Sequence, residues 1–359
     1  MLTLKYKFII VNKLYIKFKL KKLQHFYILG IETSCDETGI AVYSSMNNIL
    51  SNEIFSQIKI HKKFGGVIPE IAAREHIKKF MPTFNKAIEK SNININLISA
   101  IAYTAGPGLV GSLLVGSAFA KTLSYVLNIP SIPINHLEGH ILICKMEYPN
   151  IKYPFLSLII SGGHTQIVIV YDIGIYKIIA DTLDDAVGEV FDKVAKMMNL
   201  GYPGGPEISK IAKKSKQLFD LTIPMKKNKK LYFSFSGLKT QIRKLYENSD
   251  KTDQIKSDIA FSFEKIVVET LILKIKLASE IYKINQIAIV GGVASNTRLR
   301  NEIKLDNHLR NIDVFFPKKI YCTDNGAMIA YCGYLKFMQK KIYSNQIKIF
   351  TQWNLDAKL

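Results

Sequence analysis

Residues 27–43, YILGIETSCDETGIAVY, form two apolar segments separated by a turn of small and polar residues. Residues 155–171, FLSLIISGGHTQIVIVY, repeat that plan. Apolar runs bounded by Gly, Ser and Thr are typical of buried strands, and a glycine-bearing break between two such runs indicates a hairpin. The two copies predict a chain of two similar halves, each with its own sheet.

A third apolar run, residues 286–292 (QIAIVGG), predicts a strand that ends in a Gly-Gly turn before a helix. Further helices are expected at residues 69–80, 111–127, 185–198 and 258–282. Mixed strands and helices with a duplicated hairpin predict an α/β protein of two lobes with a central cleft.

The length of 359 residues also favours two packed lobes over a single core. We expect an N-terminal lobe over residues 28–150, a C-terminal lobe over 151–345 and a tail over 346–359. The boundary is placed at EYPNIKYP, where two prolines flank a polar run.

Residues 1–27 form a basic extension that we expect to lie outside the fold, because they contain lysines but no acid, Arg or Ser. Lysine interrupts every apolar run, which excludes a secretory signal peptide. An organellar transit peptide and an upstream in-frame extension both remain open. A cytoplasmic location is the first expectation, since four cysteines without a CxxC pair indicate free thiols in a reducing compartment.

The chain carries 49 Lys and Arg against 29 Asp and Glu, a net charge of +20 that would attract a polyanion. The richness in Lys, Ile and Asn equally fits a compositional bias of the genome, so charge alone leaves a nucleic-acid partner open. Residues 105–120 are apolar but stop at Lys121 and are shorter than a membrane span of about 18 residues. We expect a buried helix there and no membrane association.

Two Gly/Ser/Thr turns that face each other across a cleft would offer backbone N–H groups to a phosphate chain from both sides. Actin, sugar kinases and Hsp70 hold ATP in this way, so the duplication predicts a two-lobed actin-like ATPase fold. The glycines alternatively serve only the tight turns. The segment GSAFAKT ends like a Walker A motif, but Val115 and Ala120 stand where glycines are required, which excludes a P-loop.

The segment NHLEGH, residues 135–140, contains two candidate metal ligands. In a helix, the spacing of four residues places His136 and His140 on one face. A zinc peptidase of the HExxH type needs its glutamate directly after the first histidine, where this chain has Leu137. Glu138 is expected to point away from the ion. A peptidase would therefore lack its general base, whereas a metal site keeps two ligands; two ordinary helix histidines are the alternative.

Asp324 is a candidate third ligand because it follows an apolar run and precedes a helix that begins near Gly326. Acids at strand ends commonly face the cleft in α/β proteins, although Asp324 is equally placed to cap that helix. Two histidines and one aspartate with open positions suit zinc or ferrous iron. His164, in SGGHTQ, is either a further ligand or a turn residue bonded to phosphate or backbone.

Nine segments of the chain then resemble one known family. In order they are GIETSCDET, HKKFGGVIPEIAAREH, AYTAGPGLVGSLLVG, NHLEGH, SGGHTQ, DDAVGEVFDKVAKMMNLGYPGGP, FSFSGLKT, GGVASNTRLR and CTDNGAM. Together they are similar to the TsaD family of tRNA N6-adenosine threonylcarbamoyltransferases, formerly called glycoproteases. The resemblance covers residues 30–328 and implies an actin-like ATPase fold.

The resemblance also implies a reaction. A threonylcarbamoyl group passes from threonylcarbamoyl-adenylate to N6 of adenosine 37 in tRNAs that read ANN codons. One divalent metal ion per subunit, iron(II) before zinc, would be held by His136, His140 and Asp324. The adenylate would contact Ile159, Ile160, Ser161, Gly162, Gly163, Asp192, Gly205 and Asn296. The chain departs from many bacterial relatives at Ser209, where they have an aspartate.

For catalysis, a metal ion that polarises the acyl oxygen and offsets charge at the phosphate would help a weak amine nucleophile. Asp36, in SCDET, is either the general base for that amine or a turn-capping acid. Glu70 begins a helix and is expected, with Arg74 and His76, to face tRNA or a partner subunit. His61 and His76 are expected to be solvated.

Residues 225–240 combine lysines with aromatic residues, as expected of a tRNA contact. Lys226, Lys227, Lys229, Lys230 and Lys239 would bind phosphates. Tyr232, Phe233 and Phe235 would stack on bases or pack in the core. The resemblance further implies the protein partners TsaB and TsaE. A metallopeptidase and a non-catalytic ATP-binding scaffold are the alternative functions.

Overall fold

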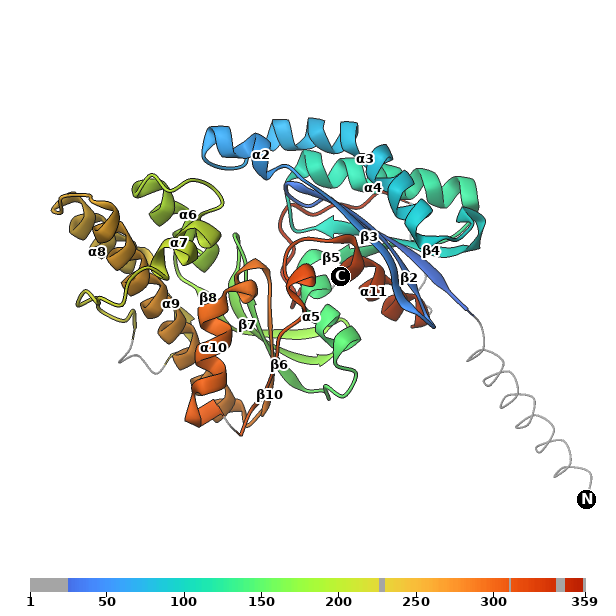
Figure 1. Cartoon of the computed structure of the whole chain (residues 1–359). Coiled ribbons are helices and arrows are strands. Elements are labelled where there is room, and N and C mark those ends of the chain that lie inside the picture. Colours follow the sequence, from blue (N-terminus) through green and yellow to red (C-terminus); the bar gives the residue numbers. More distant parts are fainter. Residues whose placement is uncertain (1–24, 226–229, 310, 340–345, 358–359) are drawn as a thin grey trace, which may run out of the picture.

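The computed structural model describes residues 25–225, 230–309, 311–339 and 346–357. It contains two mixed sheets with helices on and between them (Figure 1). The strands are β1 (Tyr27–Glu32), β2 (Glu37–Ser44), β3 (Asn48–Ser56), β4 (Ile98–Gly106), β5 (Ser131–Asn135), β6 (Phe155–Ile160), β7 (Thr165–Asp172), β8 (Ile175–Thr182), β9 (Tyr232–Phe233), β10 (Gln286–Val290) and β11 (Asp313–Phe315). The α-helices are α2 (Ile58–His61), α3 (Pro69–Ser91), α4 (Val110–Leu127), α5 (His136–Glu147), α6 (Val187–Met197), α7 (Gly204–Ala212), α8 (Ser236–Glu247), α9 (Asp253–Tyr282), α10 (Thr297–Leu305) and α11 (Gly326–Met338).

The two sheets share one plan. The first has the order β3-β2-β1-β4-β5 and the second β11-β10-β6-β7-β8-β9. In each, the first strand pairs antiparallel with its hairpin partner and parallel with a later strand, β4 for β1 and β10 for β6. The duplicated hairpin, and with it the α/β class, is therefore confirmed.

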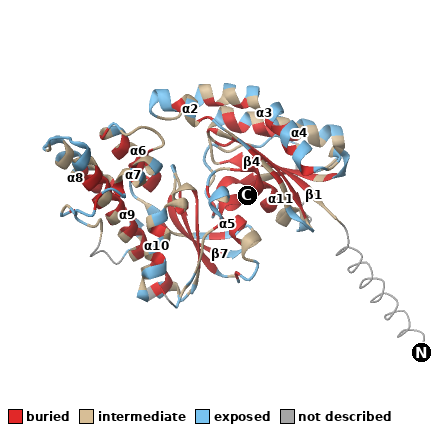
Figure 2. Ribbon diagram, in the orientation of Figure 1, coloured by how far each residue is buried: buried red, intermediate tan, exposed pale blue. Residues whose placement is uncertain are grey.

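Successive side chains of a strand point to opposite faces of its sheet, and both faces of each sheet are apolar. In the first sheet, Leu29 and Ile31 of β1 pack with Phe80 of α3. In the second, Leu156 and Leu158 of β6 pack with residues of α6 to α10. The remaining faces meet in a third core that also contains Leu137 of α5 and residues of α11 (Figure 2). The helices α5 and α11 thus lie between the two sheets and join them.

The division of the chain at residues 28, 150 and 345 stays a prediction, and the packing differs from it in three places. His25 Nε2 lies 2.7 Å from Ser44 Oγ, so ordered contacts begin before residue 28. α11 packs on β1, β2 and β4 of the first sheet, although it falls in the predicted C-terminal lobe. The tail returns to the same sheet, since Phe350 N donates to Ala105 O over 2.7 Å.

Glycines explain why α11 packs on the first sheet, although its residues fall in the predicted C-terminal lobe. A Cβ on Gly30 of β1 would lie 2.3 Å from Gly326 O of α11, and a Cβ on Gly39 of β2 would lie 2.6 Å from Gly326 N. The helix therefore seats directly on the backbone of the first hairpin, which only residues without a side chain permit. Gly30 and Gly39 stand in the stretch that defines the fold.

Helix boundaries differ from the sequence predictions mainly at α3 and α9. α3 continues past Phe80 to Ser91 with Pro82 inside it, although proline favours a helix end. α9 begins at Asp253, five residues before the predicted start, because the Thr252 side chain caps it by accepting from Ile255 N.

α4 is the one helix in the described ranges that is long and apolar enough to cross a membrane by length and composition. The prediction of a buried helix there is wrong in part, because only 33% of its residues are buried. Leu113 and Ala120 pack inward, whereas Leu114 and Val126 are exposed. α4 lies beside α3 on the outer face of the first sheet (Figure 1).

Candidate metal centre and nucleotide cleft

The two histidines of the candidate metal site stand on the first turns of α5. Asn135 ends β5 and caps the helix, its Oδ1 accepting from Leu137 N at 2.9 Å and Glu138 N at 3.3 Å. Helix formation places His136 and His140 one turn apart, with ring centroids 4.8 Å apart. The predicted common face is confirmed.

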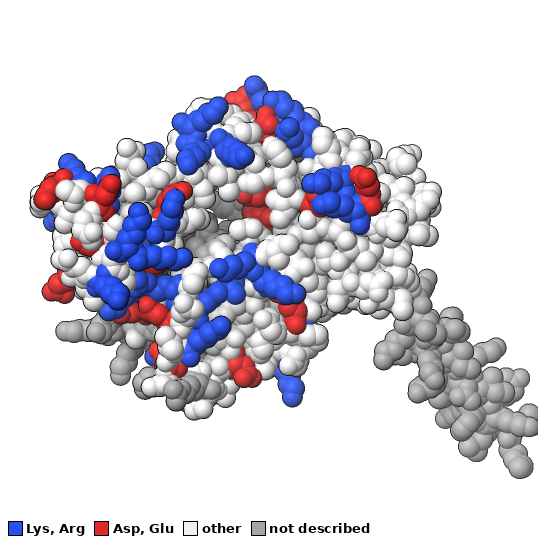
Figure 3. All heavy atoms as spheres, viewed as in Figure 1, with Lys and Arg blue, Asp and Glu red and all other residues white. Residues whose placement is uncertain are grey.

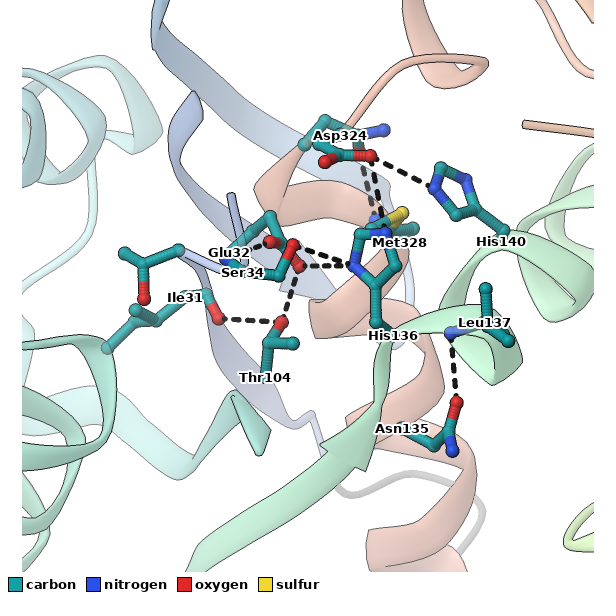
Figure 4. Close-up of polar contacts among 12 residues, drawn as sticks. Ile31, Glu32, Ser34, Thr104, Asn135, His136, Leu137, His140, Asp324 and Met328 are labelled. Carbon is teal, nitrogen blue, oxygen red and sulfur yellow. Dashed lines mark hydrogen bonds and ion pairs between the residues drawn. The ribbon is translucent and has the colours of Figure 1, made fainter. Parts of the chain in front are cut away.

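Asp324 joins them from the turn before α11, 184 residues away in the chain from His140. Its Oδ1 lies 3.1 Å from His140 Nε2 and 3.4 Å from His136 Nε2 (Figure 4). The alternative role as a helix cap is excluded, because Asn325 caps α11 by accepting from Met328 N at 3.0 Å. The carboxylate of Asp324 is therefore left for the cleft.

These three residues fit a divalent metal ion. One potential ligand atom from each lies within 4.8 Å of the others, and both histidines are buried. Two imidazole nitrogens and one carboxylate oxygen are donors that zinc and ferrous iron accept. The distances from Asp324 Oδ1 to the two histidine nitrogens, 3.1 and 3.4 Å, are those expected of atoms that share an ion at about 2 Å.

The same atoms form an ion-pair network without metal. Burial disfavours a charge on His136, but Asp324 and Glu32 overcome it and raise the pKa of His136 well above its ordinary value. Burial would likewise raise the pKa of Asp324, but His136 and His140 hold it well below its usual range. A cation entering the site would have to displace a proton from this network.

Sequence reasoning missed Glu32, the last residue of β1. Its Oε2 lies 3.0 Å from His136 Nδ1, and the side chain is fully buried (Figure 4). The signal was an acid at the end of an apolar strand, where it must either face the cleft or find buried partners. Glu138 behaves as predicted and points away, accepting from Tyr176 Oη at 2.8 Å.

Five of the residues expected to contact the adenylate lie at the end of β6 and in the turn that follows it. Ser161, Gly162 and Gly163 form the turn, and Ser161 N donates to His164 O over 2.9 Å. A Cβ added to Gly162 or Gly163 would meet no atom within 4 Å, so the turn borders open space. The side chains of Ile159 and Ile160 are fully buried in two different cores and do not reach that space.

His164 lies close to the candidate metal site without joining it. Burial and the charges of His136 and His140 lower the pKa of His164 to about 4. It is absent from the one group of metal-binding side chains found in the described ranges. Its backbone N–H donates to Ser161 Oγ over 3.1 Å, so His164 belongs to the turn, and bonding of its ring to phosphate or backbone stays a prediction.

Asp192 and Gly205 meet where α6 precedes α7. Asp192 Oδ1 accepts from Gly204 N at 2.6 Å, which fixes the first turn of α7. Burial raises the pKa of Asp192, and the carboxylate of Asp36 across the cleft adds to that rise. A Cβ on Gly205 would meet no atom within 4 Å. The start of α7 therefore faces open space beside the carboxylates of Asp192 and Asp36.

Asn296 lies in a separate polar cluster at the start of α10. Its Nδ2 donates to Ser209 Oγ at 3.2 Å and to Glu264 Oε1 at 2.8 Å. Ser209 Oγ donates to the same Glu264 oxygen at 2.5 Å, and Arg298 pairs with the other at 3.0 Å. Beside Ser209, α9 supplies the buried carboxylate of Glu264.

The expectation that His61 and His76 are solvated is wrong, since both are fully buried. His76 Nδ1 lies 2.8 Å from Thr38 Oγ1, and its Nε2 lies 3.0 Å from Cys35 O. The ring therefore holds the turn that carries Asp36. A buried imidazole is stable here because both ring nitrogens have partners.

Glu70 and Arg74 behave as expected of surface residues on α3. The two form an ion pair at 2.5 Å, with 75% and 69% of their side chains exposed. Each is therefore available to a partner, whereas the same prediction is wrong for His76, which is fully buried.

The predicted tRNA segment divides between core and surface. Phe233 and Phe235 are fully buried and pack in the second core, whereas Tyr232 is 41% exposed. Lys239 pairs with Asp185 at 2.6 Å. Lys226, Lys227 and Lys229 lie outside the described residues. Figure 3 shows many lysines and arginines beside the hollow between the two halves of the molecule.

Duplicated hairpins, helices between two mixed sheets and a cleft at their strand ends define an actin-like ATPase fold. Two solved structures share it at low sequence identity. HypF in a phosphate- and nucleotide-bound form has a TM-score of 0.57 at 15% identity, covering 88% of this chain and 56% of that one. Component A of (R)-2-hydroxyglutaryl-CoA dehydratase from Acidaminococcus fermentans has a TM-score of 0.52 at 14% identity, covering 87% and 98%.

The chain belongs to the TsaD family, tRNA N6-adenosine threonylcarbamoyltransferase, which it matches over residues 48–331. A protein of that name from Wigglesworthia glossinidia brevipalpis is 48% identical over 92% of this chain and 97% of its own length. Another, from Legionella pneumophila strain Philadelphia 1, is 47% identical over 88% and 95%. The resemblance drawn from nine short segments is thereby confirmed.

Proposed function

We propose that this transferase moves a threonylcarbamoyl group from threonylcarbamoyl-adenylate to N6 of adenosine 37 in tRNAs that read ANN codons. Family membership at 47–48% identity supports the reaction. The observation that carries the proposal is the convergence of His136, His140 and Asp324 at the cleft. Leu137 argues against the metallopeptidase, because its position would have to supply the general base.

In the proposed step, the adenine N6 attacks the threonylcarbamoyl carbonyl. The new C–N bond forms, the bond between that carbonyl carbon and the phosphate oxygen breaks, and AMP leaves with the electron pair. Asp36 accepts the proton that N6 loses. It is 7% exposed and lies in the turn held by His76, so its carboxylate is fixed before substrate arrives.

Glu37 supports this assignment of roles. Burial and the charges of Asp36 and Asp324 raise the pKa of Glu37 well above its ordinary value. Burial and its acidic neighbours therefore favour the protonated form of Glu37, so Glu37 is not the proton acceptor. An iron(II) ion, or zinc, held by His136, His140 and Asp324 would supply positive charge beside the acyl oxygen and the phosphate.

The adenylate is proposed to lie between the Ser161–Gly163 turn and the start of α7. Gly162, Gly163 and Gly205 border open space, so backbone N–H groups can approach a phosphate there. Asn296, held by Glu264, would contact the nucleoside from α10. Asp192 would act through the helix start that it fixes rather than through direct contact.

The proposed partners are tRNA and the proteins TsaB and TsaE, in the cytoplasm. An apolar surface on the outer side of α3 and α4 supports a protein partner, because Ile77, Leu114 and Val126 are 61%, 46% and 71% exposed. This surface lies on the face of the first sheet opposite the metal site. A partner there would leave the cleft open to tRNA. Ile77→Glu with Leu114→Glu should abolish co-purification with TsaB.

Threonylcarbamoyl transfer into a tRNA transcript, with TsaB, TsaE and the adenylate present, tests the proposal. Incorporation should require A37 and disappear in an A37→G transcript. His136→Ala should lose bound metal and activity together. Absence of A37-dependent incorporation would overturn the transfer, and full activity of metal-free protein would overturn the metal's role alone.

A further inference from the structure

Glu32, at the end of the apolar strand β1, has an unusual environment for a charged side chain. The carboxylate is fully buried, yet it lies among three donors from three different segments (Figure 4). Ser34 N donates to Oε1 at 2.6 Å, Thr104 Oγ1 donates to Oε2 at 2.5 Å, and His136 Nδ1 lies 3.0 Å from Oε2. Burying a carboxylate is costly unless it is hydrogen-bonded, so these three contacts are what keeps Glu32 inside the protein.

We propose that Glu32 is the positioning residue of the metal site and orients His136 from behind. A metal ion is held by an unprotonated ring nitrogen, so when His136 binds through Nε2 its ring proton is on Nδ1, which donates to Glu32 Oε2 at 3.0 Å. That fixes the tautomer and leaves the lone pair of Nε2, the nitrogen 3.4 Å from Asp324 Oδ1, directed at the metal position. The inference rests on the proposed metal site and deepens it.

The other partners of Glu32 make this orientation rigid. Thr104 belongs to β4 and Ser34 to the turn after β1, so the carboxylate is fixed from two parts of the first sheet. Ser34 Oγ also lies 3.2 Å from His136 Nδ1. Charge-assisted hydrogen bonds of this kind are shorter and stronger than neutral ones. Glu32 itself has no oxygen directed at the metal position, which distinguishes it from a fourth ligand.

The two histidines are not equivalent in this respect. His140 Nδ1 is buried and has no hydrogen-bond partner among the described residues. Of the two imidazoles, His136 alone is therefore held through its second nitrogen. Changing Glu32 should disturb one ligand and leave the other two in place, so metal binding should weaken rather than vanish.

Glu32→Gln is the sharpest variant, because it keeps the shape but turns one oxygen into a donor. With the amide oxygen facing Ser34 N, the NH2 group faces His136 Nδ1 and forces that nitrogen to accept. The proton then moves to Nε2, where it blocks coordination. We expect Co²⁺ affinity, measured by chelator competition after metal removal, to fall about 10- to 100-fold. The absorption spectrum of bound Co²⁺ should shift, and ¹⁵N NMR of the metal-free protein should show that His136 no longer carries a proton at Nδ1.

Glu147→Gln is the control, a glutamate at the far end of the same helix whose Oε2 accepts from Lys318 N at 2.6 Å. It should bind Co²⁺ with wild-type affinity and spectrum. Thr104→Val removes a donor to Glu32 without touching His136, and a several-fold loss of affinity is expected. If Glu32→Gln does not fold by circular dichroism, Thr104→Val decides the matter, and unchanged affinity there overturns the inference.

Including His136→Ala separates the two proposals. Wild-type protein that binds Co²⁺, loss of binding in His136→Ala and unchanged binding and spectrum in Glu32→Gln would overturn the role of Glu32 alone. Wild-type protein that binds no Co²⁺, or His136→Ala that binds it equally well, would overturn the metal site itself and the inference with it.

Discussion

The Oε2 atom of Glu138 lies 2.6 Å from Nζ of Lys336, in an ion pair whose side chains are 2% and 14% exposed. The pair joins α5 to α11, the two helices between the sheets. Tyr176 Oη, on β8 of the second sheet, donates to the other oxygen of Glu138 at 2.8 Å. Glu138, between the two histidines of the candidate metal site, therefore connects the two halves of the molecule through Lys336 and Tyr176.

Glu138→Ala should destabilise the fold by about 3–5 kcal/mol, because it leaves a buried ammonium group without its carboxylate. Chemical denaturation measures the loss. Glu70→Ala is the control, since its ion pair with Arg74 is exposed and should be worth less than about 1 kcal/mol. Equal stability of Glu138→Ala and Glu70→Ala would contradict the role of Glu138 in connecting the two halves of the molecule.

Gly30→Ala should destabilise the protein, because the new methyl group would lie 2.3 Å from the backbone oxygen of Gly326. Moving α11 away from β1 should cost about 1–3 kcal/mol or more, visible as a lower Tm. Gly205→Ala meets no atom within 4 Å and should leave Tm unchanged while weakening AMP binding. A Gly205→Ala protein with normal AMP affinity would remove Gly205 from the nucleotide site.

Ser209→Ala should weaken AMP binding about 2- to 10-fold, the worth of one hydrogen bond. The change removes the donor to Glu264 and loosens the group that holds Asn296. Calorimetric titration with AMP gives the affinity. Thr240→Ala loses a comparable hydroxyl on α8, whose hydrogen bond to Ser236 O is exposed, and should not change it. Equal affinities of all three proteins would place the nucleotide elsewhere.

Metal binding should strengthen as the pH rises. The pKa of His136 in the metal-free protein is raised by Asp324 and Glu32 against the effect of burial, so the site holds a proton that a cation must displace. Affinity should therefore increase with pH until the pKa of His136 is passed, and then level off. Chelator-competition titrations between about pH 6 and pH 8 measure this. Affinity independent of pH would mean that His136 is already neutral.

Removing residues 350–359 should lower Tm, although they were expected to be a tail. Trp353 packs against the first core, and its backbone oxygen accepts from Asn135 Nδ2 at 3.0 Å. Asn135 caps the helix that carries both histidines. Trp353→Ala alone should account for much of the change, about 1–3 kcal/mol. A truncated protein with wild-type Tm and metal affinity would contradict this role.

The parts of the fold predicted correctly are those that local patterns encode. Alternation and glycine breaks in residues 27–43 and 155–171 are enough to indicate two hairpins. Helical spacing places His136 and His140 on one face, and Leu137 removes the peptidase glutamate without any structure. His61 and His76 were predicted wrongly, because a buried histidine is recognised only by the partners that surround it.

By itself, then, the sequence determined the class, the family and the two candidate metal ligands that share a helix turn. Tertiary structure decided which of two roles Asp324 takes, which residue stands behind His136 and where α11 packs. The reason is range: periodicity acts within a few residues, whereas Glu32 and Asp324 reach the histidines across 104 and 184 positions of the chain. The position of Asp324 depends on the close packing of α11 against β1 at Gly30, and this packing forms only in the folded protein.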